Sequence, residues 1–465
     1  MTKSRLIAAS AAWGLLWAGT AFAEPLVVPD DLKACIECHS GSTEIGQKIL
    51  SAKAGWGQSV HALGQRQLVF DSESHEAIGF YWGGSMSSMG NGSSCQVCHT
   101  NEGFLNLIDG KYDSPEAVAA EVLAHPSPIG CSTCHLVHEE TDFSVLTVPS
   151  GTPVHNGINA TYDKPEGSIC VACHSVRLMD GRVATFDNTI DRIMNSLKAD
   201  LTLTAHFGPH YGGEADILVG ANGAEYAGMD YTDDSAHSTD AKSNCTSCHM
   251  PLRTDMMSHL SAGLGNHSFE ITAPLRGATG ANLGGCESCH DIVKRDLTTY
   301  TVQESSGYLV AGKLYFQDAK DWTLSTETEV VKLETPKQPA RMVSDILVRL
   351  ADPDQGCSGL LTAAYDQITG TSGGMRFTND AHERCVIAGY GRDKLPAATA
   401  ETEPSARLLK AIWNFALITE GDATLGLHNL NYTLRLAYDS CADLNDLVGG
   451  GDVAAACNDP AANRP

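Results

Sequence analysis

Residues 131–135 read Cys131-Ser-Thr-Cys134-His135, and this arrangement of two cysteines followed by a histidine occurs six times in the 465 residues. The two intervening residues predict a single turn that points both thiols towards one edge of a planar group, with the histidine beneath it. C-x-x-C-H is the attachment motif of a c-type haem. The thiols bind the two vinyl groups of the porphyrin, and the histidine ligates the iron.

The six motifs account for twelve of the sixteen cysteines. One copy alone is compatible with a redox dithiol or with half of a zinc site. Six copies, each with histidine in the same place, predict six covalent c-type haems. The predicted attachment residues are Cys35, Cys38, Cys95, Cys98, Cys131, Cys134, Cys170, Cys173, Cys245, Cys248, Cys286 and Cys289. The predicted proximal iron ligands are His39, His99, His135, His174, His249 and His290.

The overall charge narrows the class of partner. Lys and Arg total 31 against 56 Asp and Glu, which gives a formal net charge of −25. A nucleic-acid binder needs a basic face, so this balance argues against nucleic acid. It favours basic redox partner proteins over anionic membranes.

The first residues have the layout of an export signal. Lys3 and Arg5 precede an apolar stretch at residues 6–20, and Ala21-Phe22-Ala23 is a small-x-small cleavage site. We expect residues 1–23 to be a signal peptide. The alternative, a membrane anchor, is disfavoured because a span needs about 20 apolar residues. The sequence therefore predicts an exported protein, periplasmic, extracellular or at the cell surface, with no membrane span after signal cleavage.

Residues 24–295 are predicted to form a hexahaem cytochrome domain. Six porphyrins supply apolar volume, so we expect mostly coil with short α-helices organised around the haems. Ser114 predicts a helix at residues 115–124, and residues 186–197 carry an apolar helical stripe.

Residues 296–465 are predicted to form a small α+β C-terminal cap region. Strands are expected at 298–303, 308–317 and 328–334. Ser405 is the expected N-cap of a helix that ends near Gly421, and His428 is expected to open another. Four cysteines remain, and loop length favours disulfides between Cys357 and Cys385 and between Cys441 and Cys457. Free thiols are the alternative.

Each haem iron has a second axial position, and twelve further histidines could fill the six positions. His138 lies three residues after His135 and cannot reach the opposite face of the same ring, so it would ligate a neighbouring haem. Other candidates stand in distinctive contexts: Trp56-Gly-Gln-Ser-Val-His61-Ala, Gly208-Pro-His210-Tyr-Gly, Ser235-Ala-His237, Gly265-Asn-His267-Ser-Phe and Gly426-Leu-His428-Asn.

In these segments the chain resembles soluble multihaem c-type cytochromes of the group that includes extracellular cytochrome nanowires. The resemblance covers about residues 30–290 and a short segment around His428. It implies that the distal iron ligands are His61, His138, His210, His237, His267 and His428. His155 and His206 are the alternatives to individual members of this set.

Six bis-histidine haems predict low reduction potentials and no vacant iron position, because methionine ligation is what raises the potential. The expected function is therefore electron transfer rather than catalysis, between redox partner proteins and an external acceptor. The alternative is a multihaem oxidoreductase of the nitrite or hydroxylamine type with one open haem, which Gly426-Leu-His428-Asn429 also resembles. A monomer and a self-assembling filament subunit share every motif above, so both stay open.

Overall fold

The computed structural model describes part of the chain, and the account below is confined to it. The described residues are 40–57, 59–63, 67–70, 77–81, 96–111, 127, 129–136, 145–146, 162, 164, 167–176, 201–204, 208–209, 212–232, 235–240, 242–251, 266–269, 285, 339–352, 357–370, 377–379, 385–387, 390–422, 424, 426–453 and 457. The chain divides into two compact units, residues 1–50 and residues 51–465.

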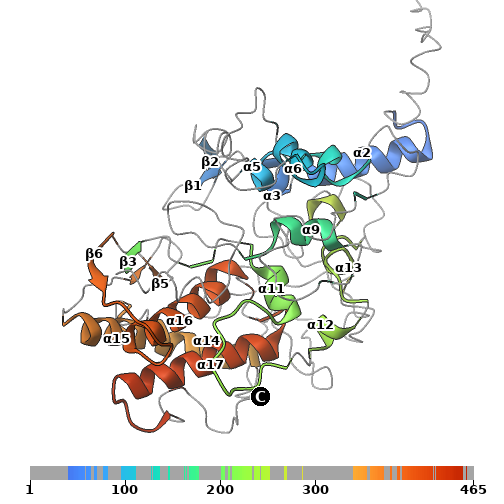
Figure 1. Cartoon of the computed structure of the whole chain (residues 1–465). Helices are drawn as coiled ribbons and strands as arrows, with labels where there is room; N and C mark the ends of the chain where they lie inside the picture. The colour runs from blue at the N-terminus through green and yellow to red at the C-terminus, as the bar shows by residue number, and fades with distance from the viewer. Residues whose placement is uncertain are drawn as a thin grey trace, which may run out of the picture. The chain divides into compact units, whose positions relative to one another are not determined.

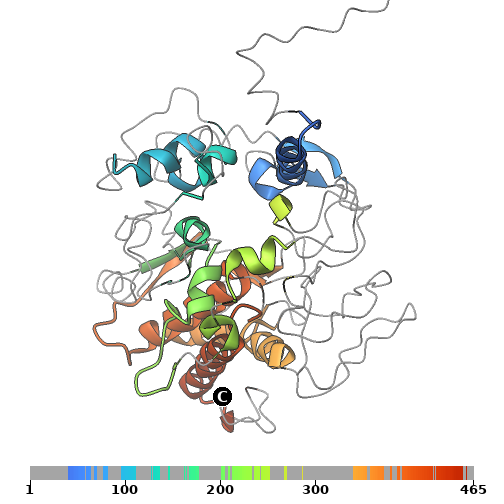
Figure 2. The same ribbon diagram turned by 90° about the vertical axis from the view of Figure 1, so that its right-hand side faces the viewer.

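Four helices near the C-terminus form the largest packed region (Figures 1 and 2). They are α14 (Pro339–Ala351), α15 (Leu360–Thr369), α16 (Pro404–Ala416) and α17 (Leu430–Leu447). Helix α17 packs against both α14 and α16, and α15 contacts the other three. The chain after α16 continues through the π-helical turn η6 (Leu417–Gly421).

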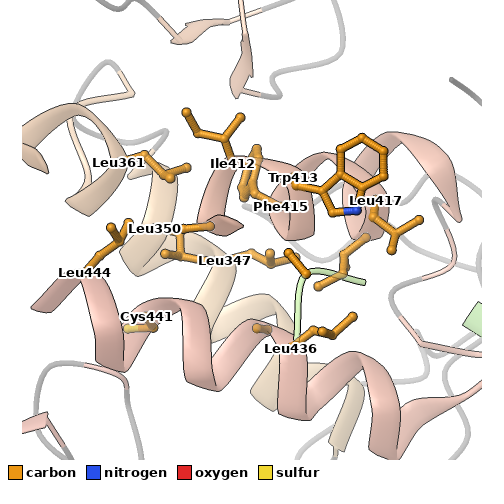
Figure 3. Packing of buried hydrophobic residues seen from close by; sticks show 14 of the residues in the cluster. Leu347, Leu350, Leu361, Ile412, Trp413, Phe415, Leu417, Leu436, Cys441 and Leu444 are labelled. Atoms are coloured by element: carbon orange, nitrogen blue, oxygen red, sulfur yellow. The ribbon is translucent and has the colours of Figure 1, made fainter. Parts of the chain in front are cut away.

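The core of this helical region is aliphatic and aromatic. Figure 3 shows Leu347, Leu350 and Leu361 converging with Ile412 and Leu436 between the helices. Each of these five side chains is buried. Burial of a Leu or Ile side chain is worth about 1.5–3 kcal/mol, so these helices hold together through their apolar faces.

Polar bonds tie the C-terminal helices to an earlier loop at residues 221–226. The indole Nε1 of Trp413 donates to the Asn222 carbonyl at 2.9 Å. The Asn414 side chain accepts from the Ala224 amide at 2.7 Å and donates to its carbonyl at 3.0 Å. This loop follows α11 (Glu214–Val219), so α16 fixes the position of that helix.

The strands are short and pair two by two. β1 (Gln67–Phe70) pairs antiparallel with β2 (Ala77–Tyr81), and β4 (Phe377–Asn379) pairs antiparallel with β5 (Cys385–Ile387). β3 (Leu201–Thr204) pairs antiparallel with β6 (Tyr390–Leu395), with Leu201 opposite Leu395. This third pair joins two segments that are about 190 residues apart in the sequence.

Of the helices described before residue 300, all are short apart from α2 (Glu44–Trp56) and α6 (Asn101–Ile108). Four of them carry haem motifs: α5 (Gln96–His99), α8 (Cys131–Cys134), α9 (Ser168–Cys173) and α13 (Cys245–His249). The others are α3 (Val60–Leu63), α11, α12 (Ala236–Thr239) and the 3₁₀ turn η3 (Asn266–Ser268).

One predicted helix boundary was wrong. Helix α16 begins at Pro404 with Glu403 as its N-cap, while Ser405 is buried inside the first turn. Proline is favoured at the first helical position because it has no N–H to satisfy there. The Glu403 carboxylate instead accepts from the Thr399 amide at 2.6 Å.

The remaining predicted elements fall into two groups: helix boundaries that the structure describes, and elements that lie outside the described residues. The helical segment after α16 ends at Gly421, as predicted. Helix α17 begins at Leu430 with Asn429 as its N-cap, directly after His428. The predicted signal peptide, the strands at 298–303, 308–317 and 328–334, and the helices at 115–124 and 186–197 lie outside the described residues.

The predicted disulfide between Cys441 and Cys457 is present, with Cα atoms 5.8 Å apart. Cys357 is also disulfide-bonded, and its predicted pairing with Cys385 stays a prediction. In the portion of the chain that the structure describes, no helix is long and apolar enough to cross a membrane.

Candidate haem centres

The structure describes fifteen of the predicted haem-site residues. They are Cys98, Cys131, Cys134, Cys170, Cys173, Cys245, Cys248, His61, His99, His135, His174, His237, His249, His267 and His428. Nine lie outside the described residues: Cys35, Cys38, Cys95, Cys286, Cys289, His39, His138, His210 and His290. The alternatives His155 and His206 also lie outside them.

Each described motif forms the single turn that its spacing predicts. In the third motif (residues 131–135) the His135 amide donates to the Cys131 carbonyl at 2.9 Å. In the fourth (residues 170–174) the His174 amide donates to the Cys170 carbonyl at 2.8 Å. The turn therefore places each histidine next to its first cysteine.

The second, third and fourth motifs pack around one small apolar cluster. Val97, Phe104, Leu107, Ile169 and Ala172 are its buried members. The partly buried cysteines against it are Cys98, Cys134, Cys170 and Cys173. Three attachment turns thus share one interior rather than three separate ones.

The fourth motif also contacts the fifth (residues 245–249). The Cys245 thiol lies 3.3 Å from the Tyr162 hydroxyl and 4.0 Å from the carbonyl of Gly167, the residue that precedes α9. The nearby Cys170 side chain lowers the pKa of Cys245, and the Tyr162 hydroxyl acts in the same direction. The attachment thiols of two different motifs therefore lie side by side.

Among the described residues, histidine rings from distant parts of the chain approach one another in three pairs. The ring centres of His61 and His174 are 6.0 Å apart, and so are those of His135 and His267. The rings of His249 and His428 are 6.3 Å apart. Each pair joins one predicted proximal ligand to one predicted distal ligand.

These separations fit an iron between the two rings. Two metal–nitrogen bonds of about 2 Å, with roughly 1.1 Å from each nitrogen to its ring centre, put the ring centres about 6.2 Å apart. Direct van der Waals packing of aromatic rings allows 4.5–7 Å. The ring spacing alone therefore does not distinguish ligation from packing, and the hydrogen bonds of the rings supply the second criterion.

Metal-bound histidines almost always donate their second ring N–H to a carboxylate or carbonyl. Nδ1 of His249 lies 3.0 Å from the Phe269 carbonyl, and Nδ1 of His237 lies 2.6 Å from the Leu427 carbonyl. Nδ1 of His267 lies 2.7 Å from the Asn266 side-chain oxygen. Because a carbonyl oxygen only accepts, Nδ1 carries the proton in each ring and Nε2 is left for a metal.

Two further histidines donate to carboxylates. Nδ1 of His174 lies 3.1 Å from Glu214 at the start of α11. Nδ1 of His428 lies 2.5 Å from Asp422, whose side chain is fully buried. The two carboxylates stand on neighbouring segments, since the Gly213 amide donates to the Gly421 carbonyl at 2.9 Å.

Protonation of the rings follows these environments. Burial, together with His174 and His249, lowers the pKa of His61 to about 4. Burial also lowers the pKa of His249 and of His267. Neutral imidazole is the form that binds a metal. Burial opposes a charge on His428 as well, but Asp422 outweighs burial and raises the pKa of that ring.

The position of His61 follows from its sequence context. The Ser59 hydroxyl donates to the Trp56 carbonyl at 2.7 Å and accepts from the Ala62 amide at 3.2 Å. Ser59 thereby caps the short helix α3 that carries His61. The Trp56 indole donates to the Ile129 carbonyl at 3.1 Å, two residues before the third motif. The W-x-x-S-x-H segment is therefore a capped turn anchored beside a haem motif.

His267 lies on a turn that packs closely against α2. A Cβ atom at Gly55 would approach the Ser268 amide nitrogen at 3.2 Å and the His267 carbonyl carbon at 3.4 Å. Glycine at position 55 therefore allows the backbone of the η3 turn to come close to α2.

Sequence reasoning missed three residues that contact the histidines. Glu214 and Asp422 accept hydrogen bonds from His174 and His428. The Phe269 ring contacts the rings of His61 and His267. For Asp422 the available signal was an acidic residue six positions before His428. No sequence signal pairs Glu214 with His174, because that contact joins segments 40 residues apart.

Residues 27–187, about a third of the chain, match the family described as outer membrane cytochrome MtrC/MtrF-like, domains II/IV. No curated protein and no solved structure gives a significant match. The matched region contains the first four C-x-x-C-H motifs. Cytochromes of this kind carry covalently bound c-type haem. Residues 27–187 are therefore similar to a family of multihaem cytochromes of the extracellular electron-transfer group.

Proposed function

We propose that the protein carries electrons along six c-type haems whose irons are each held by two histidines. The observation that carries this proposal is the set of three facing histidine pairs, with ring centres 6.0–6.3 Å apart. In each pair at least one ring donates its Nδ1 hydrogen to an oxygen, which leaves Nε2 for the iron. A haem iron, when bound, supplies one-electron oxidation and reduction.

The ring pairs support one distal ligand for each of three haems. In this proposal His267 serves the third motif with His135, His61 serves the fourth with His174, and His428 serves the fifth with His249. In every case the two histidines come from different segments, so the haem joins parts of the chain far apart in sequence. His39, His99 and His290 stay assigned as the other proximal ligands, and His138, His210 and His237 as the other distal ligands.

The contacts between motifs favour a continuous haem series through the middle of the chain. The second, third and fourth motifs share one apolar cluster. The thiols of the fourth and fifth motifs lie together near Tyr162. When haem is bound, Cys170 and Cys245 would each hold one porphyrin, so their proximity would bring two haems close together, which fast electron transfer requires.

Two histidines per iron leave no coordination position for a substrate, which favours an electron carrier over a reductase with one open haem. A net charge of −25 suits basic partner proteins. The outer-membrane family match favours action at the cell surface or beyond it, with an external acceptor. Self-assembly into a filament is compatible with the same haem set, as is a monomer.

The test replaces one distal histidine at a time in the haem-loaded full-length protein. His61→Gly, His267→Gly and His428→Gly should each open one of the six irons. Each variant should therefore bind carbon monoxide at about one-sixth of its haem, whereas the wild type should bind none.

His155→Gly tests the alternative ligand, because His155 is a surplus histidine outside the predicted set. It should not bind carbon monoxide. The ligand set would be wrong if His155→Gly opened an iron, or if His61→Gly left all irons closed. Intact mass spectrometry of the wild type tests the haem count, and any number other than six would contradict the proposal.

A further inference from the structure

Phe269 has a backbone conformation that is unusual for an aromatic residue. It follows the η3 turn directly and has φ = 60°, in the left-handed region. Its amide donates to the Asn266 carbonyl at 3.2 Å, which closes the turn. Bulky residues adopt this conformation only where the surrounding structure holds them there, and such positions cluster at functional sites.

Three different histidines contact Phe269. Its ring centre is 5.0 Å from that of His61 at an interplanar angle of 85°, an edge-on contact. It is 6.0 Å from the ring centre of His267, at 67°. The Phe269 carbonyl accepts the Nδ1 hydrogen of His249 at 3.0 Å.

These three histidines belong to three different ring pairs. His61 faces His174, His267 faces His135, and His249 faces His428. A single half-buried residue therefore contacts one member of each pair. It reaches two of them with its side chain and the third with its main chain.

On the basis of the function proposed above, we propose that Phe269 is a shared positioning residue for the haems of the third, fourth and fifth motifs. Its ring orients His61 and His267 and excludes water from their haems. Its carbonyl fixes the orientation of His249. Phe269 touches axial ligands rather than reacting atoms, so its effect appears in the spectra and potentials of the haems.

The two kinds of contact give an asymmetric prediction. Substituting the side chain removes the contacts with His61 and His267 but keeps the carbonyl that binds His249. A smaller side chain admits water near two irons. Water stabilises the more highly charged ferric form, so the midpoint potentials of those two haems should fall. The potential of the haem bound by His249 should stay unchanged.

The experiment compares Phe269→Leu and Phe269→Ala in the haem-loaded full-length protein by ferric EPR and by spectroelectrochemical titration. The expected result is a changed low-spin signal and a lowered potential for two haems only, with the larger change in Phe269→Ala. His61→Gly and His267→Gly, made separately, assign the two signals. Phe269→Leu retains most of the side-chain volume, so it still tests the proposal if Phe269→Ala does not fold.

Phe415→Leu is the matched control. Phe415 is a buried aromatic residue of α16 and belongs to the apolar cluster of the C-terminal helices. The Phe415→Leu variant should have a lower thermal stability but unchanged EPR signals and midpoint potentials for every haem. Unchanged spectra and potentials in both Phe269 variants would overturn the role of Phe269. If His61→Gly instead altered no signal in the parent protein, the ligand set of the proposed function would fail.

Discussion

Replacing Asp422 with asparagine removes a buried negative charge beside a predicted iron ligand. The Asp422 carboxylate is fully buried and lies 2.5 Å from Nδ1 of His428. Its other oxygen accepts from the Thr424 amide at 3.1 Å and from the Thr424 hydroxyl. Asparagine keeps the size and one acceptor oxygen, so the substitution mainly changes charge.

The expected effect is a higher reduction potential for the haem of His428. Adding about 2 Å for the iron–nitrogen bond and roughly 2 Å across the imidazole puts the carboxylate oxygen about 6.5 Å from the iron. At an effective dielectric constant of about 20, a unit charge at that distance stabilises the ferric form by about 2.5 kcal/mol. With 59 mV per factor of ten for one electron, the potential should rise by about 100 mV.

The assay is a redox titration of the haem-loaded protein, followed optically and by EPR. Asp443→Asn is the control, because it removes a carboxylate of the same region that bonds Arg407 at 2.9 Å instead of a histidine. The midpoint potential of one haem should rise in Asp422→Asn, and no haem potential should change in Asp443→Asn. The reasoning would be refuted if all potentials of Asp422→Asn coincided with those of the wild type at unchanged haem content.

Three further outcomes follow from the same contacts. Glu214→Gln should also raise the midpoint potential of one haem, but by less than Asp422→Asn. Water screens the charge of Glu214, because the Glu214 and His174 side chains, 3.1 Å apart, are 32% and 44% exposed. A redox titration measures the difference. Gly55→Ala should displace the η3 turn by a few tenths of an ångström, since the new methyl group would lie 3.2 Å from the Ser268 amide nitrogen. An altered low-spin signal for the haem of His267 would bear this out, and an unchanged signal would count against it. Replacing Cys441 and Cys457 together with alanine should cost about 3 kcal/mol, because their disulfide closes a loop of 16 residues. Thermal melts should shift downward while the ferric EPR spectrum stays the same.

Local features of the haem site were predictable from the sequence, since short spacing determines them. The C-x-x-C-H turn needs only five consecutive residues, and the turn at residues 131–135 has the expected form. The cap of α3 by Ser59 is likewise local. The disulfide between Cys441 and Cys457 could be predicted because few residues separate its ends.

Contacts between distant segments were not predictable. His61 and His174 come together only after the whole chain is folded, and no spacing rule specifies that pair. The same holds for β3 and β6, which pair Leu201 with Leu395. Phe269 could be read as an ordinary apolar residue, because its left-handed backbone and its three histidine contacts depend on tertiary structure.

The central claim is that every iron is closed by two histidines, and the spin state of the ferric protein tests it most directly. EPR and visible spectra of the ferric, haem-loaded full-length chain would be recorded with and without nitrite, and visible spectra of the reduced chain with and without carbon monoxide. The account predicts uniformly low-spin haem and spectra that neither addition changes. A high-spin component of about one-sixth of the iron that binds the added ligand would contradict it, because one haem would then be open to substrate.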